Sequence, residues 1–356
     1  MTDRPALDTD RLTRALEHVR GQVTGGRVSY AALAVARSDG LVGSVARRAG
    51  DHSDVTWRSA IASITKPITA TVVMQAVESG ALVLHEPIAT YLPDWHQPPP
   101  PSGEPAVPIT TWHVLTHTAG FRDAAEEVYL TDPPTGAAVL ARLASTPLLF
   151  RPGSAYAYTT DSFQLLAEIV ERVRGRSFAA LMREDLFAPL GMAATTFDPR
   201  DGAPPGLPIE GRLGPPGVDG ETVLDYFVAL AMPGGGLWST AEDIARFGRA
   251  MLLGGRVDGV RVLGRPFVEA MTRLQTAGLA EAGTGRPPDY ALGWGRTGIG
   301  PGAIPSPTAF GHGGATGSTL VVDPANDLVI AYLRNEWGSS GAPAEEAVAL
   351  VYAALA

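Results

Sequence analysis

Strand-like patterns lie near both ends of this chain, and their distribution is the strongest constraint on its fold. The runs RVSYAALAVAR (27–37) and LVGSVARRAG (41–50) come early and are joined by a turn at 38–40. Two late runs, GSTLVVD (317–323) and DLVIAYLRN (327–335), flank 324–326 and are typical of a hairpin. We therefore expect the two ends of the chain to build one antiparallel sheet.

Helical patterns bracket these strands. A first helix is predicted to be capped by Asp8 and to end at Gly21, and a last helix covers 342–356, with Val348, Val351, Tyr352 and Leu355 on one face. Between about 85 and 220, proline-rich links alternate with short amphipathic helices, and strand signals are few. The sequence predicts an α+β fold in which helices flank an antiparallel sheet. Residues 1–84 and 221–356 would form that domain, with an inserted, mainly helical domain at 85–220.

Composition excludes several classes of function. The 356 residues carry a net charge of -9, which argues against nucleic acid or an anionic membrane as a partner. There is no cysteine, so disulfides and thiolate metal sites are excluded, and the histidines show no metal-ligand spacing. The first residues are polar and no apolar run reaches membrane-spanning length. We expect a cytoplasmic protein without a signal peptide, metal or cofactor.

Lys66 is the single lysine of the chain, against 28 Lys+Arg in total. It stands in IASITKPITA (61–70), three residues after Ser63, at the start of a predicted helix. Arginine keeps its proton at any working pH, whereas a desolvated lysine can release it. Ser-x-x-Lys is a spacing that places a nucleophile beside a base. The alternative is that an arginine-rich composition left one lysine by chance.

Further segments give these residues a family context. They are SITK (63–66), VLTHTAGF (114–121), FRPGSAYAYTT (150–160), LFAPLGMAATTF (186–197), PGGGLWSTAEDIARFGRAML (233–252) and GHGGATGSTLVVDP (311–324). In this order they resemble motifs of the serine β-lactamase and penicillin-binding protein superfamily. Within it, the chain is most similar to the class C β-lactamase-like and DD-peptidase-like group, which includes family VIII esterases and several acyltransferases.

The resemblance implies roles for particular residues. Ser63 would be the acyl-accepting nucleophile, Lys66 its partner and Tyr158 a second base, with Lys66 and Tyr158 sharing one proton. Tyr156 lies two residues before Tyr158, but the register of the motif favours Tyr158. His117 is expected to be a structural hydrogen-bonding residue.

The same resemblance implies where substrate would bind. His312, Gly313 and Gly314 would form the edge-strand box beside the site. The backbone N–H groups of Ser63 and Ala315 would form the oxyanion hole. GHGGATG is not a phosphate loop, because it lacks the Lys-Ser/Thr ending and precedes no predicted helix.

One position departs from the family pattern: the tyrosine motif usually ends in Asn, and Thr160 stands there. The shorter hydroxyl disfavours amide substrates. We therefore expect a serine hydrolase that acts through a Ser63 acyl-enzyme on small ester or thioester substrates. The alternatives are an acyltransferase or a peptide-releasing or cyclising thioesterase in specialised metabolism, and a DD-peptidase or β-lactamase-type amide hydrolase. A non-catalytic binding protein is the least favoured reading.

Overall fold

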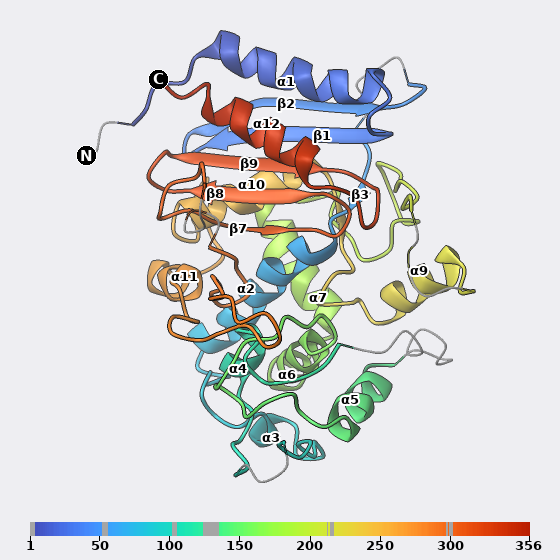
Figure 1. Ribbon diagram of the computed structural model, residues 1–356, viewed down its shortest axis with the longest axis vertical. Coiled ribbons are helices and arrows are strands. Elements are labelled where there is room, and N and C mark those ends of the chain that lie inside the picture. Colours follow the sequence, from blue (N-terminus) through green and yellow to red (C-terminus); the bar gives the residue numbers. More distant parts are fainter. Residues whose placement is uncertain are drawn as a thin grey trace.

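The computed structural model describes residues 4–51, 56–101, 105–123, 135–211, 213, 217–296, 298 and 302–356. Its centre is a five-stranded sheet with the order β2-β1-β9-β8-β7. The strands are β1 (Tyr30–Arg37), β2 (Gly40–Arg48), β7 (Phe310–Gly313), β8 (Thr319–Asp323) and β9 (Leu328–Leu333). Strand β1 pairs antiparallel with β9, with Ala34 opposite Ala331. The predicted antiparallel sheet from both chain ends is confirmed (Figure 1).

Helices cover the two faces of this sheet (Figure 1). On one face, α1 (Thr9–Thr24) and α12 (Ala342–Tyr352) bury Leu33 and Val35 of β1. On the other face, α10 (Ala241–Leu252) packs against Ala32 and Ala34 of the same strand. This helix approaches the sheet so closely that a Cβ on Gly248 would lie 2.5 Å from a methyl group of β9. The sheet is therefore sandwiched between two helical layers, which explains why every residue of β1 is buried.

The remaining elements build the helical part and its links to the sheet. The helices are α2 (Thr65–Glu78), α3 (Ile88–Tyr91), α4 (Thr111–Leu115), α5 (Gly136–Ser145), α6 (Phe163–Arg174), α7 (Phe178–Met182), α8 (Ala188–Leu190), α9 (Gly220–Ala229) and α11 (Arg265–Thr272). Short strands β3 (Ser59–Ala60) and β4 (Trp238–Ser239) pair with each other, as do β5 (Arg256–Val257) and β6 (Val260–Arg261). Helix α2 is buried almost all round and packs against α6.

Several local predictions are confirmed and others need correction. Between 85 and 220 the described residues contain no strand of two or more residues, as the scarcity of strand signals there predicts, and Thr110 caps α4. The first helix runs past Gly21 and ends at Gly25, and Leu355 lies beyond the last helix. The segment 177–191 is divided into α7, a π-helical turn at Arg183–Phe187 and α8. In the described part of the chain, no helix combines the length and apolarity needed to cross a membrane.

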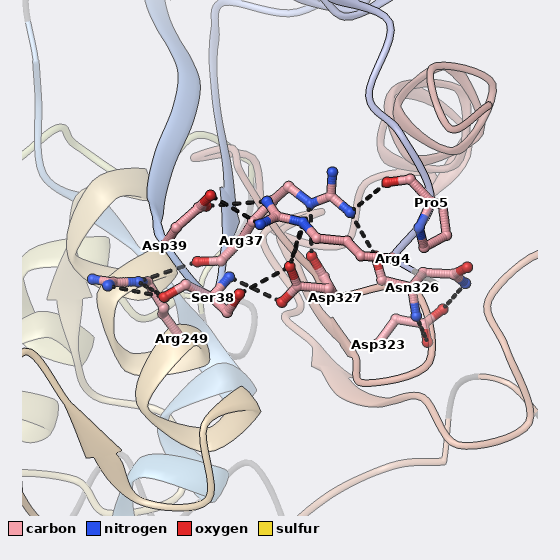
Figure 2. A network of polar contacts seen from close by, with 9 residues as sticks. All are labelled: Arg4, Pro5, Arg37, Ser38, Asp39, Arg249, Asp323, Asn326 and Asp327. Carbon is pink, nitrogen blue, oxygen red and sulfur yellow. Dashed lines mark hydrogen bonds and ion pairs between the residues drawn. The ribbon is translucent and has the colours of Figure 1, made fainter. Parts of the chain in front are cut away.

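A polar network connects the N-terminal segment to two strand-connecting turns at one end of the central strands (Figure 2). The buried guanidinium of Arg37 donates to the Pro5 and Asp327 carbonyls at 2.7 and 3.2 Å. Asp327, in the β8–β9 turn, accepts from the Ser38 N–H at 2.9 Å and pairs with Arg4 at 2.8 Å. The N-terminal segment, the β1–β2 turn and the β8–β9 turn thus stabilise one another.

A fragment of residues 1–84 is expected not to fold alone, because it keeps β1 and β2 but loses β9, α10 and α12. Circular dichroism and thermal scans should show no cooperative transition, whereas the full chain should unfold with one. A cooperative transition in the isolated fragment would contradict the pairing of both chain ends as a requirement for folding. The domain boundaries at 84 and 221 remain a prediction.

Candidate active site

Ser63 lies on a strained turn between the short strand β3 and helix α2. It belongs to a short 3₁₀ helix, η1 (Ala62–Ile64), and the preceding Ala62 has φ 46°, a left-handed conformation that non-glycine residues rarely adopt. The turn is held from both sides: the Ile61 N–H donates to Leu237 O at 2.9 Å, and the Thr316 hydroxyl donates to Ala60 O at 2.8 Å. Such strain persists where surrounding contacts over-determine it, which is common at functional sites.

Lys66 lies one helical turn beyond Ser63, and its side chain is completely buried. Its Nζ contacts three oxygens: Gly234 O at 2.7 Å, Ser63 Oγ at 3.2 Å and Thr160 Oγ1 at 3.3 Å. Desolvation lowers the pKa of Lys66 to about 7, while the carboxylates of Asp123 and Asp161 oppose the shift. At neutral pH a substantial fraction of this lysine is therefore an uncharged amine with a free lone pair.

Tyr158 completes the group. Its phenol hydrogen-bonds Ser63, and Lys66 Nζ lies 4.7 Å from the centre of its ring. Burial raises the pKa of Tyr158 well above its ordinary value, and the Ser63 hydrogen bond opposes this only in part. The structure thus favours a neutral phenol beside a partly neutral lysine. A neutral phenol beside a neutral amine carries the same single proton as a phenolate beside an ammonium, so the sharing of one proton stays a prediction, with the proton placed on Tyr158.

Thr160 joins the lysine to the loop after α9. Its hydroxyl accepts from Lys66, and its backbone N–H donates to the carboxylate of Asp123. Gly234 packs so closely that a Cβ there would lie 2.5 Å from Thr160 O. A glycine is therefore required at 234 for this approach, and the carbonyl of the same residue receives Lys66.

His312 lies on the edge strand β7, but it makes no hydrogen bond to Ser63 or Lys66. Its Nδ1 lies 2.7 Å from Gly313 O, and because a carbonyl only accepts, Nδ1 carries the proton. Nε2 therefore accepts from the Tyr290 hydroxyl at 2.9 Å. Desolvation and the nearby Lys66 lower the pKa of His312 to about 3, so the imidazole is neutral.

The residues after His312 approach the Ser63 turn, and the oxyanion hole assigned to Ser63 and Ala315 stays a prediction. A Cβ on Gly314 would lie 2.4 Å from Ile61 O, so this glycine permits close contact between β7 and the turn. Gly313 and Ala315 are exposed at the edge of the sheet. Among the described residues the Ala315 N–H has no protein acceptor, and it is left available to a substrate oxygen.

His117, expected to be structural, positions the tyrosine segment. It has φ 56°, its Nδ1 accepts from the Thr159 N–H at 3.3 Å, and its ring centre lies 4.4 Å from that of Tyr158. Desolvation, followed by the charge of Lys66, holds its pKa well below the ordinary value. Because the acceptor nitrogen is Nδ1, the proton of this neutral ring resides on Nε2.

Sequence reasoning missed four residues that complete the site: Tyr290, Gly234, Asp123 and Asp161. Tyr290 fixes His312, Gly234 receives Lys66, and the two carboxylates oppose the fall in the pKa of Lys66. None has a spacing that predicts its role, although Gly234 stands in the recognised PGGGLWST segment. The described residues contain no cluster of three or more His, Cys, Asp or Glu side chains suited to a metal ion.

Comparisons with known proteins identify relatives of this chain. Residues 15–354 match the family described as Beta-lactamase. Penicillin-binding protein 4 of Amycolatopsis lactamdurans is 31% identical over 283 residues, covering 77% of this chain and 71% of the relative. Esterase EstB of Burkholderia gladioli is 28% identical and covers 93% of this chain and 92% of its own. The solved structure of EstCE1, a hydrolase with promiscuous acyltransferase activity, superposes with a TM-score of 0.78 at 20% identity, covering 96% and 99% of the two chains, and supports the fold. The chain belongs to the beta-lactamase family of serine hydrolases.

Proposed function

We propose that this enzyme forms an acyl-enzyme on Ser63 and hydrolyses small ester or thioester substrates. The observation that carries the proposal is the buried amine of Lys66, 3.2 Å from Ser63 Oγ, with a pKa lowered to about 7. A general base works best when its pKa lies near the operating pH. An uncharged amine has two N–H groups and one lone pair. With Gly234 O and Thr160 Oγ1 as acceptors, the lone pair is free to face the serine hydroxyl.

Acylation follows from these contacts. Neutral Lys66 takes the proton of Ser63 as Oγ attacks the carbonyl carbon, and the N–H groups of Ser63 and Ala315 hold the resulting oxyanion. Tyr158 donates its phenolic proton to the leaving oxygen or sulfur and is reprotonated by the ammonium of Lys66. Water then attacks the acyl-enzyme, gives up a proton along the same route in reverse, and releases the acid and Ser63.

The substrate class rests on Thr160 and on similarity to an esterase. The Thr160 hydroxyl is already engaged by Lys66, and Gly234 packs against the rest of its side chain, so little of Thr160 is free to orient a substrate amide. EstB is named as an esterase, which supports ester hydrolysis. If an alcohol or amine replaces water, the same acyl-enzyme gives acyl transfer. The acyltransferase activity in the description of EstCE1 makes this the second candidate.

Ser63 is expected to carry the covalent intermediate. Incubation with a fluorophosphonate or a short acyl ester should add the corresponding mass to the peptide that contains Ser63. Ser63→Ala should abolish both labelling and turnover. Labelling of another residue, or undiminished turnover by Ser63→Ala, would contradict the assignment.

Lys66→Arg is expected to be nearly as damaging as Lys66→Ala, with kcat/KM lowered about 10²–10⁴-fold. Arginine keeps the charge, but its pKa stays above about 12 and it cannot accept the serine proton. Both variants are measured on one ester, with circular dichroism to confirm folding. In the wild type, kcat/KM should rise with pH through about 7, as the neutral fraction of Lys66 grows.

A folded Lys66→Arg enzyme within about fivefold of the wild type would show that only the charge matters. Arg183→Lys is a suitable control, because Arg183 lies in the π-helical turn with an exposed side chain that pairs with Glu184. This exchange of one cation for the other should leave kcat/KM unchanged.

Thr160 is expected to favour esters over β-lactams. Short-chain p-nitrophenyl esters should be turned over more efficiently than penicillins or cephalosporins. Thr160→Asn should move the ratio of kcat/KM values toward amides, because an amide side chain adds donors and reach. A wild-type enzyme that hydrolyses a cephalosporin as efficiently as its best ester would overturn this preference.

A further inference from the structure

The charges around Ser63 are unevenly distributed. Two carboxylates, Asp123 and Asp161, act on Lys66. Asp161 is compensated, because Arg142 pairs with it at 2.7 Å. Asp123 has no ion pair with any lysine or arginine in the described ranges, although its neighbour Arg122 is exposed. Within the described ranges, the positive charge that acts on the carboxylate of Asp123 is that of Lys66, which is only partly protonated near pH 7.

Backbone contacts hold the carboxylate of Asp123 in place. Its Oδ1 accepts the N–H of Thr160, and the N–H of Asp161 also donates to the carboxylate. Burial raises the pKa of Asp123, while these two donors favour the charged form. The residue still exposes surface to solvent. Thr160 contacts both residues: its N–H donates to Asp123, and its hydroxyl accepts from Lys66. A single residue therefore lies between Asp123 and the lysine beside Ser63.

The other titratable groups beside Ser63 offer no positive charge to a substrate. His312 and His117 are buried and neutral, and His312 has both ring nitrogens engaged. Lys66 is enclosed, and its three contacts are directed at protein oxygens. A substrate carboxylate bound near the scissile carbonyl would therefore lose water without gaining a counter-charge, whereas an ammonium group would gain Asp123.

We infer that Asp123 is a specificity-determining residue that selects acyl donors with a cationic group near the reacting carbonyl and disfavours donors with a carboxylate there. This inference rests on the proposed Ser63 acyl-enzyme and names the charge class of its substrate. An unscreened like or opposite charge at such a partly exposed position changes kcat/KM by about tenfold or more.

Three ethyl esters of similar shape test the inference. They are the ester of γ-trimethylammonio-butyrate, its tert-butyl carbon isostere, which is neutral, and monoethyl glutarate, which carries a carboxylate. In the wild type at low salt, kcat/KM should follow the order cation, neutral, anion. The differences should shrink as ionic strength rises, because salt screens exposed charges.

Asp123→Asn should lower the cation-to-neutral ratio by about tenfold and raise the anion-to-neutral ratio by a similar factor. The asparagine oxygen can still accept the Thr160 N–H. Any change in the pKa of Lys66 affects all three esters equally and cancels in the ratios. Asp123→Glu keeps the charge and should keep the order. Arg122→Gln is the matched control, because it removes the adjacent positive charge and should move neither ratio more than about twofold.

The outcomes separate this inference from the proposed function. If fluorophosphonate fails to label Ser63, the acyl-enzyme itself is wrong. If Ser63 is labelled and esters are hydrolysed, but the wild type prefers monoethyl glutarate, the inference about Asp123 is overturned. It is also overturned if Arg122→Gln moves the ratios and Asp123→Asn does not. Should Asp123→Asn fail to fold, the substrate order of the wild type and its salt dependence decide the question.

Discussion

The arrangement of the site depends on the complete burial of one amine. An unpaired ammonium in the interior costs far more than most single interactions return, so Lys66 requires oxygens around it and a lowered pKa. The oxygens come from three separate segments: the turn at Ser63, the tyrosine segment at Thr160 and the glycine-rich segment at Gly234. Because α2 starts from the sheet side and α6 follows the tyrosine segment, these contacts join the two halves of the fold. The first turn of α2 therefore contributes both to the packing of the fold and to the chemistry of the site.

The strained backbone of Ala62 is a second feature of the site that depends on distant segments. A left-handed alanine directly before the nucleophile persists only because neighbours on both sides hold the turn. One neighbour is Leu237, next to β4, and the other is Thr316, after β7. Gly314 allows β7 to approach closely enough for this support. The same edge of β7 carries the Ala315 N–H, so one contact both holds the serine turn and brings an oxyanion donor toward Ser63.

Features that depend on neighbouring residues in the sequence were predicted correctly. The apolar runs of β1, β8 and β9 and the Ser63–Lys66 spacing lie in short stretches of sequence, and they are found where expected. Contacts between distant residues were not predictable, because nothing near Tyr290 or Gly234 indicates a partner such as His312 or Lys66. The end of the first helix was misplaced at Gly21, since a glycine inside a helix costs only about 1 kcal/mol and α1 continues past it to packing residues such as Val23.

Burial, which a sequence does not show directly, also decides the protonation states. Tyr158, His117 and His312 all remain neutral, since desolvation dominates the pKa of each group. Lys66 is therefore the group of this cluster whose pKa lies near neutrality. Asp123 and Asp161 oppose the desolvation of the amine and keep its pKa from falling further. A lysine buried without them would lose its proton more readily and become a weaker base. The two carboxylates thus preserve its basicity near pH 7.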